Sequence, residues 1–284
     1  DDAIDTFERV LGYEPAHSVA LEALNQIYEQ TEQWHALADI LEQQIQGAPD
    51  NGRDVKSDKL RLAEVSRRYL NEIERAVELY GEVLDSQRET PTARKALEEL
   101  LDEPTVAARV ADQLEDFYRR ENDWSSLAEL LATRAETADD RLRRVEWWSD
   151  RARILENHLD DTRGAAESYS RAWQSAVLEG SNASEEPREA LRRLAESEGY
   201  WDEWIDAAHS VLDALSDADR RVELHWRLGQ TYLDQIDDEV EAEEQFRAIL
   251  QIDSAQFRAF GELEALLTRQ ERWLDLVELL DDWF

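Results

Sequence analysis

Histidine is the first residue type to consider for metal binding or acid–base chemistry, and this chain has five. No two of them lie three or four residues apart, so no helix turn presents a pair of imidazoles to a metal ion. None stands in the H-E-x-x-H pattern of the metalloproteases. We therefore interpret them as ordinary helix or loop residues: His17, His35, His158, His209 and His225.

Paired carboxylates are the second candidate for chemistry, since the chain has 67 Asp and Glu residues. A calcium loop needs oxygen ligands at alternate positions with a glycine between them. The nearest segment, Ser216-Asp217-Ala218-Asp219, lacks the glycine and the closing glutamate. Acidic pairs suit helix starts, where they cap the backbone and complement the dipole. We predict that role for Asp139-Asp140, Asp160-Asp161 and Asp237-Asp238.

Motifs for catalysis and for cofactor binding are missing from the sequence. It contains no glycine-rich phosphate loop, no G-x-S-x-G and no nucleotide fingerprint. It contains no cysteine, which excludes thiolate nucleophiles and thiolate metal sites. Two carboxylates that merely lie close together do not indicate a hydrolase. We expect no enzyme activity, no metal and no cofactor, with an enzyme or metal-binding protein as the remote alternative.

The charge balance limits the class of partner. The 67 acids face 32 Lys and Arg residues, a net charge of −35. Binding to a phosphate backbone requires cations, so we expect no nucleic acid partner. No run of about 18 apolar residues is present, so we expect no direct membrane insertion. We expect a soluble segment, cytoplasmic by preference, and, because it has no Met, one cut from a longer protein.

Two repeated motifs alternate along the chain. The first is an Ala, an aromatic four residues later and two apolar residues beyond it, and it begins at Ala3, Ala76, Ala165 and Ala242, at intervals of about 73, 89 and 77 residues. The second is a Trp with a large apolar residue three positions later, and it begins at Trp34, Trp124, Trp201 and Trp273. Steps of three and four place the residues of each motif on one helical face.

A helix of this kind cannot bury its apolar stripe alone, so successive helical hairpins must stack. The alanine lets a neighbouring helix approach, and the aromatic fills the space beside it. We predict that the ten tryptophans are mainly packing residues. Trp147-Trp148 is the exception, because adjacent helical residues point about 100° apart and at most one can sit squarely in the core.

These segments resemble the tetratricopeptide repeat, W-x2-L-G-x2-Y followed by A-x3-F and P over about 34 residues. The last copy has Leu228-Gly229-Gln230-Thr231-Tyr232 before Ala242 and Phe246, and the first ends in Pro15. The sequence is most similar to the divergent long arrays of bacteria. The resemblance implies an all-α fold, a right-handed α-solenoid or superhelix of about 16 helices.

We expect residues 1–284 to form a single solenoid domain, itself a fragment of a longer repeat protein. Its units are expected at 1–12 (a half unit), 17–46, 56–87, 91–137, 139–178, 186–215, 218–252 and 255–284. The unit 91–137 is expected to hold an extra helix, with a break at Asp102-Glu103-Pro104. Turn residues predict loops over Gly47–Gly52 and Leu178–Ser184.

The resemblance implies a protein–protein interaction scaffold that binds a peptide or protein on the solenoid surface. The alternative is a structural spacer array within a larger multidomain protein. A spacer would show evenly solvated faces, whereas a binder would show an apolar or single-sign patch. The half-tetratricopeptide arrays of RNA-processing scaffolds also repeat aromatics, but Leu228-Gly229 and Pro15 favour the tetratricopeptide type.

In the family, a groove is lined by first-helix residues just after the small packing residue and three positions further on. Carried onto this sequence, the partner-binding positions are Gln26, Glu29, Glu64, Arg67, Asp116, Arg119, Arg153, Glu156, Gln230 and Leu233. The Lys and Asn residues that clamp a peptide's terminal carboxylate in some members are absent. We therefore predict a basic or mixed-charge protein or peptide. Alternatively, the arginines pair with the acids three residues away on the same helix: Glu64, Asp116 and Glu156.

Overall fold

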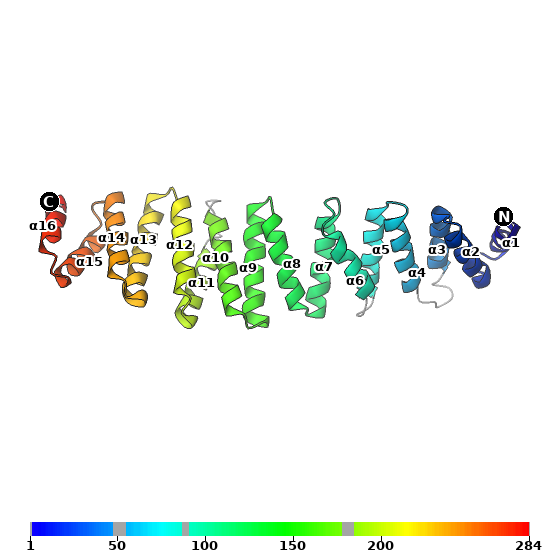
Figure 1. The fold of residues 1–284 in the computed structure, drawn as a ribbon, viewed down its shortest axis with the longest axis horizontal. Coiled ribbons are helices and arrows are strands. Elements are labelled where there is room, and N and C mark those ends of the chain that lie inside the picture. Colours follow the sequence, from blue (N-terminus) through cyan, green and yellow to red (C-terminus); the bar gives the residue numbers. More distant parts are fainter. Residues whose placement is uncertain (1, 48–54, 87–90, 178–184, 284) are drawn as a thin grey trace. The chain divides into compact units, whose positions relative to one another are not determined.

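The computed structural model describes residues 2–47, 55–86, 91–177 and 185–283, and these ranges hold sixteen α-helices (Figure 1). No strand occurs in them, so the predicted all-α class and the solenoid of helical hairpins are confirmed. Contacts divide the chain into two compact units, residues 1–123 and 124–284. That the whole of 1–284 forms one domain stays a prediction.

The first unit, within its described residues, contains seven helices, each packed on the next in sequence. They are α1 (Asp2–Tyr13), α2 (Ser18–Gln30), α3 (Trp34–Gly47), α4 (Lys56–Arg68), α5 (Ile73–Ser86), α6 (Pro91–Leu100) and α7 (Ala107–Glu121). The segment Asp102-Glu103-Pro104 separates α6 from α7, so an additional helix lies between α5 and α7. Of the loop predicted over Gly47–Gly52, Gly47 is the last residue of α3 and the rest lies outside the described residues.

The second unit contains nine helices in the part of it that the structure describes. They are α8 (Trp124–Thr137), α9 (Arg141–His158), α10 (Thr162–Val177), α11 (Glu185–Glu198), α12 (Trp201–Ala214), α13 (Ala218–Thr231), α14 (Glu239–Ile252), α15 (Phe257–Arg269) and α16 (Trp273–Trp283). A short π-helix, η2 (Tyr232–Ile236), follows α13 directly. The loop predicted over Leu178–Ser184 lies outside the described residues.

The acidic pairs begin helices, as predicted. A carboxylate oxygen of Asp140 accepts from the backbone N–H of Leu142 at 2.9 Å, at the start of α9. Asp161 accepts from Gly164 N–H at 2.9 Å, and Asp238 caps α14. Asp217, from the segment nearest to a calcium loop, caps α13. These carboxylates satisfy backbone donors that a helix leaves without partners in its first turn.

One backbone turn recurs between paired helices. Seven described residues have a positive φ, and each lies two positions before the first residue of a helix: Glu32, Asn71, Asn122, Asp160, Gly199, Asp237 and Glu271. A left-handed residue after a helix lets the chain reverse while backbone N–H groups still reach the last carbonyls. Only one of the seven is glycine, so the other six hold a conformation that side chains disfavour.

Gly199 provides a direct test of this turn. We expect Gly199→Ala to lower the free energy of unfolding by about 1 kcal/mol, because φ is +80° there and a side chain disfavours that region by about 1–2 kcal/mol. The matched control is Gly261→Ala in α15, where an added Cβ meets nothing within 4 Å; it should stabilise by about 0.5–1 kcal/mol. Urea denaturation of both variants measures the difference, and shifts of the same sign would contradict the assignment.

The residues of the first motif form the core in three of its four copies, whereas in the first copy Ala3 is exposed and Phe7 is half-buried. Ala76, Ala165 and Ala242 are fully buried, and so are the aromatics that follow them, such as Tyr80 and Phe246. The close approach that the alanines permit is clearest beside Gly229. A Cβ added at Gly229 would lie 2.6 Å from Cε1 of the Phe246 ring. A side chain at that position would therefore collide with the core.

The tryptophans divide into two sets. Trp148, Trp173 and Trp204 are buried, and Trp147 beside Trp148 is only partly buried, as expected for adjacent helical residues. The tryptophans that begin helices lie at the surface: Trp34, Trp124 and Trp201 are half-buried, and Trp273 is 56% exposed. The packing interpretation is therefore wrong for Trp273.

Candidate interaction face

The predicted partner-binding residues all lie on first helices of hairpins or at the end of one. In the first unit Gln26, Glu29, Asp116 and Arg119 are exposed, and Glu64 and Arg67 are half-buried. In the second unit Arg153 is exposed, while Glu156, Gln230 and Leu233 are half-buried, Leu233 within η2. Their side chains are therefore at least partly at the surface, but several form ion pairs with other side chains of the chain.

In the first unit, ion pairs connect α2 to α4 and α4 to the additional helix α6. Arg67 of α4 donates to Glu99 of α6 at 2.7 Å, and Glu29 of α2 pairs with Arg61 of α4. The hydrogen bond to Glu99 raises the pKa of the Arg67 guanidinium, and the same bond lowers the pKa of the Glu99 carboxyl. Exposed pairs of this kind add little stability because water and salt screen them, so they orient these side chains more than they stabilise the fold.

The second unit repeats this arrangement between α9 and α11. Arg153 pairs with Glu186 of α11 and, at 2.7 Å, with Asp150 on its own helix. Glu156 pairs with Arg193 of α11 at 2.7 Å. The Tyr169 hydroxyl lies 3.4 Å from Glu156, and burial and the charge of Glu156 raise the pKa of Tyr169 to about 12.

The alternative prediction, that the arginines pair with acids three residues away on the same helix, is therefore wrong in its choice of partners. The arginines do pair within the chain, but Arg67 and Arg153 reach acids on the next hairpin, 32 and 33 residues away. Glu64 pairs with Arg68 at 2.5 Å. Arg119 bonds to Glu115 one turn earlier, at 2.9 Å. Stacking brings the first helices of successive hairpins side by side, so partners come from the neighbouring repeat.

Two clefts follow one another along the face formed by α9, α11 and α13, which we call the inner face. The first, of about 700 Å³, lies between α9 and α11 and is lined by Val145, Glu146, Ser149, Asp150, Arg153, Glu185, Glu186 and Glu189. The second, of about 370 Å³, includes Glu189, Trp201, Trp226, Arg227 and Gln230 in its lining. Of the predicted positions, Arg153 lines the first cleft and Gln230 the second.

The α11 residues on this face were missed by the sequence reasoning, although a signal for them exists. Trp201 follows Trp124 by 77 residues. Arg193 and Glu196 lie the same 77 residues after the predicted positions Asp116 and Arg119. Arg193 pairs with α9 and Glu196 lines the second cleft. The tryptophan register would therefore have found both positions.

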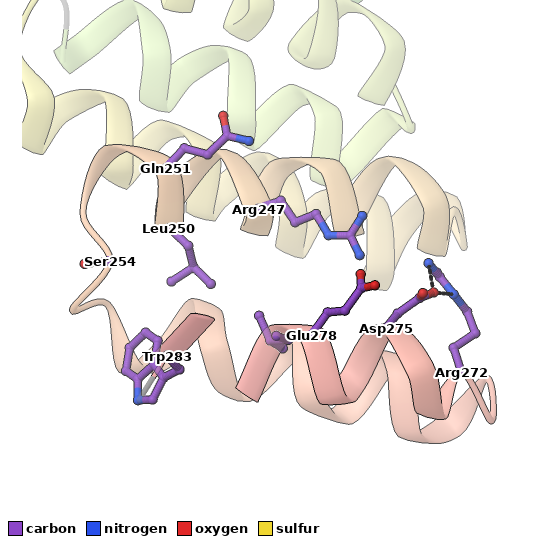
Figure 2. Close-up of a pocket in the computed structure, with 9 residues that line it drawn as sticks. Arg247, Leu250, Gln251, Ser254, Arg272, Asp275, Glu278 and Trp283 are labelled. Atoms are coloured by element: carbon purple, nitrogen blue, oxygen red, sulfur yellow. Dashed lines mark hydrogen bonds and ion pairs between the residues drawn. The ribbon is translucent and has the colours of Figure 1, made fainter. Parts of the chain in front are cut away.

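A further cleft of about 420 Å³ lies between α14 and α16, and Figure 2 shows its lining. Arg272 bonds to Asp275 at one end, and Glu278 extends toward Arg247 in the middle (Figure 2). Leu250 and Trp283 lie toward the other end. Second helices of hairpins form this cleft, and none of the predicted partner-binding residues lines it.

The histidines of the second unit make contacts of their own. His158 stacks on Trp124, with ring centroids 3.9 Å apart, and His209 Nε2 lies 3.0 Å from the Tyr232 hydroxyl. Nδ1 of His225 lies 2.9 Å from Oε1 of Gln245. In the described ranges no three His, Asp or Glu side chains gather as a metal site would require. No described helix is long and apolar enough to cross a membrane.

The half-buried His225 predicts a pH dependence of stability. Burial lowers the pKa of its imidazole below the usual 6.5. The unfolded chain then takes up a proton near pH 6.5 while the folded chain does not, so stability falls as pH drops below that value. His225→Gln, which can still donate to Gln245, should make stability less sensitive to acid between about pH 6.5 and 5.

The measurement is the urea midpoint of wild type and variant across that pH range. The exposed His35→Gln in the first unit is the matched control and should leave the wild-type slope in place. Identical slopes for wild type and His225→Gln would show that His225 titrates equally in both states.

Comparison with known proteins supports one family. Residues 20–55, which include α2 and α3, match the tetratricopeptide repeat family. No curated protein shows significant sequence similarity to the chain. Among solved structures, the chain is similar to the C-terminal part of a TPR repeat-containing protein from Cytophaga hutchinsonii, at 11% identity, 92% coverage of this chain and 93% of that one, with a TM-score of 0.28.

Two other solved structures are similar at the same level. BtubC from P. vanneervenii shares 17% identity over 89% of this chain and 88% of its own, with a TM-score of 0.29. The human IFIT1 dimer with m7Gppp-AAAA shares 17% identity over 98% of this chain and 62% of its own, with a TM-score of 0.33. Such TM-scores carry no weight for function. The family match over α2 and α3, together with hairpins that repeat its motifs, supports a tetratricopeptide-like repeat family for this chain.

Proposed function

We propose that this protein is an interaction scaffold that holds an extended segment of a basic or mixed-charge partner along the inner face of α9, α11 and α13. The observation that carries the proposal is the cleft between α9 and α11. Its lining has five carboxylates, those of Glu146, Asp150, Glu185, Glu186 and Glu189, against the single guanidinium of Arg153.

An excess of acidic side chains of this kind separates a binder from a spacer. A spacer array gains nothing from gathered like charges, because they repel one another. A cationic segment would relieve that repulsion and would be steered toward the cleft by its field. The second cleft adjoins the first at Glu189, so one extended segment can pass along both. Tetratricopeptide-type repeats generally mediate such protein–protein contacts, and solenoid surfaces suit extended ligands.

The proposal includes no catalytic step and no nucleic acid. The repeat fold generally supports binding rather than catalysis, and the acidic cleft would repel a phosphate backbone. The structural spacer is the competing hypothesis, and it is favoured by the pairs Arg67–Glu99 and Arg153–Glu186, which join neighbouring repeats. Binding measurements separate the two.

The test is fluorescence anisotropy of the intact chain with a labelled arginine-rich peptide and its glutamate-rich counterpart. We expect only the arginine-rich peptide to bind, and binding to weaken with salt. The double variant Glu146→Gln, Glu186→Gln should weaken it about tenfold. The matched control, Glu198→Gln with Asp213→Asn, removes the same charge from exposed positions outside the cleft and should leave binding nearly unchanged.

Two results would overturn the proposal. Equal weakening by both double variants would mean that the peptide senses only net charge, as expected of a spacer. Tight binding of acidic C-terminal peptides, lost in the double variant Arg67→Ala, Arg153→Ala, would show the carboxylate recognition that the sequence predicts to be absent.

A further inference from the structure

A tryptophan begins the second helix of every other hairpin, and in two of these its ring is covered by another ring. Trp34 stacks on Tyr69, with centroids 3.7 Å apart and planes 7° apart. Trp124 stacks on His158, at 3.9 Å and 11°. In both, the covering ring comes from the end of the next first helix, α4 or α9. The stack removes one face of the indole from water and adds a favourable aromatic contact.

The equivalent position for Trp201 follows from the hairpin turns. In the two stacked copies, the covering ring stands two residues before the left-handed residue that closes the hairpin, Asn71 or Asp160. For the hairpin that follows Trp201, that closing residue is Asp237. Counting back two residues gives Gln235. The third copy therefore has an amide where the other two have a ring.

A cleft lies where the stack is missing. Trp201 and Gln235 line the same cleft of about 370 Å³, a size within the range of ligand pockets. No described residue gives Trp201 a ring partner. The wall that carries Gln235 is the π-helix η2, and single π-helical turns are frequent at functional sites. Trp204 also lines this cleft, and its Nε1 is buried with no acceptor in the described chain.

The charges around the cleft indicate whether a planar ligand on the Trp201 indole should be neutral or positively charged. Arg192 bonds to Glu189 and Glu196, and Arg227 bonds to Glu189. These pairs neutralise most of the lining. Asp234 also lines the cleft, and it forms no hydrogen bond or ion pair with any residue that the structure describes. One carboxylate therefore remains without a counter-charge beside an uncovered indole face.

We propose that Trp201, Asp234 and Gln235 form a receiving site for one arginine side chain of a partner. The guanidinium lies flat on the Trp201 indole, in the place that Tyr69 and His158 occupy in the other hairpins, and pairs with the Asp234 carboxylate. A guanidinium is planar, stacks on tryptophan and binds carboxylates through two parallel hydrogen bonds. A tyrosine ring would leave Asp234 without a counter-charge, and an ammonium would not stack. The site deepens the proposed function, since it names a side chain that the bound segment should carry.

The test uses a probe smaller than any peptide, so that it does not depend on the acidic cleft between α9 and α11. The intact chain, labelled with ¹⁵N, is titrated with N-acetyl-arginine amide, and the tryptophan indole N–H signals are followed by NMR. Trp201→Phe assigns the Trp201 signal by its disappearance. We expect that signal to shift when the arginine probe binds. We expect the lysine and tyrosine analogues to bind with about tenfold lower affinity.

Two variants test the geometry. Gln235→Tyr restores the ring found in the other copies and should block the probe, with at least about a tenfold loss of affinity, while raising the melting temperature of the chain. Asp234→Asn should lower the affinity for the probe about fivefold or more without changing the fold. Glu146→Gln, in the other cleft, is the matched control and should have no effect on the probe.

The assignment is overturned if the arginine probe leaves the Trp201 signal unmoved, if the tyrosine analogue binds as well, or if Gln235→Tyr binds the probe like wild type. Failure of this site is distinguishable from failure of the proposed function. Peptide binding that depends on Glu146 and Glu186 would then persist without any response at Trp201.

Discussion

Phe246→Ala is expected to lower the free energy of unfolding by about 3–5 kcal/mol. Phe246 is fully buried, lies beside Gly229 at a distance that excludes any side chain there, and meets Trp226 with ring centroids 5.5 Å apart. Removing the ring leaves a cavity between α13 and α14 that rigid helices cannot fill. The measurement is urea denaturation followed by circular dichroism.

The control for this prediction is Phe257→Ala in the same unit. Phe257 is 77% exposed, so its removal exposes little new surface and should change stability by no more than about 0.5 kcal/mol. If the two phenylalanine variants unfold at the same urea concentration, the first motif does not build the core.

Ala76→Leu is expected to cost about 1–3 kcal/mol, for the opposite reason. Ala76 is fully buried on α5, where α4 and α5 pack together. Three added carbons must displace α4 or force neighbouring side chains out of their preferred rotamers. Both costs come from the dense packing of the interior. Thermal unfolding of the variant measures the loss.

Ala108→Leu is the matched control, because Ala108 is exposed on α7 of the same unit. Leucine and alanine are both good helix formers, so the exposed substitution should be nearly neutral. A neutral outcome at Ala76 would mean that the hairpin has room for a larger residue and that the small residue of the motif has no packing role.

The sequence determined the helices, because helix formation depends on spacing and caps that lie within a few residues of one another. The interval from Ala242 to Phe246 places both residues on one face, and both are fully buried. The acidic pairs predicted helix starts, and Asp140, Asp161 and Asp238 cap them. Proline and acidic residues at Asp102-Glu103-Pro104 marked the break between α6 and α7.

The candidate site could be predicted only in part. The sequence placed Arg67 and Arg153 on first helices correctly, because their positions follow from the repeat register. It gave the wrong pairing, because Glu99 and Glu186 come within reach only after the next hairpin has stacked. Charge pairing at the surface depends on packing between repeats, and no local pattern encodes it.

Only the tertiary structure brought Trp201, Asp234 and Gln235 to one cleft. The sequence shows a tryptophan at the start of four helices, and it shows Gln235 at the end of another helix. It does not show that Tyr69 and His158 cover the tryptophans of the other copies. A missing stack can be recognised only after the stacks are seen, because each one joins residues on different hairpins whose distance is set by helix packing.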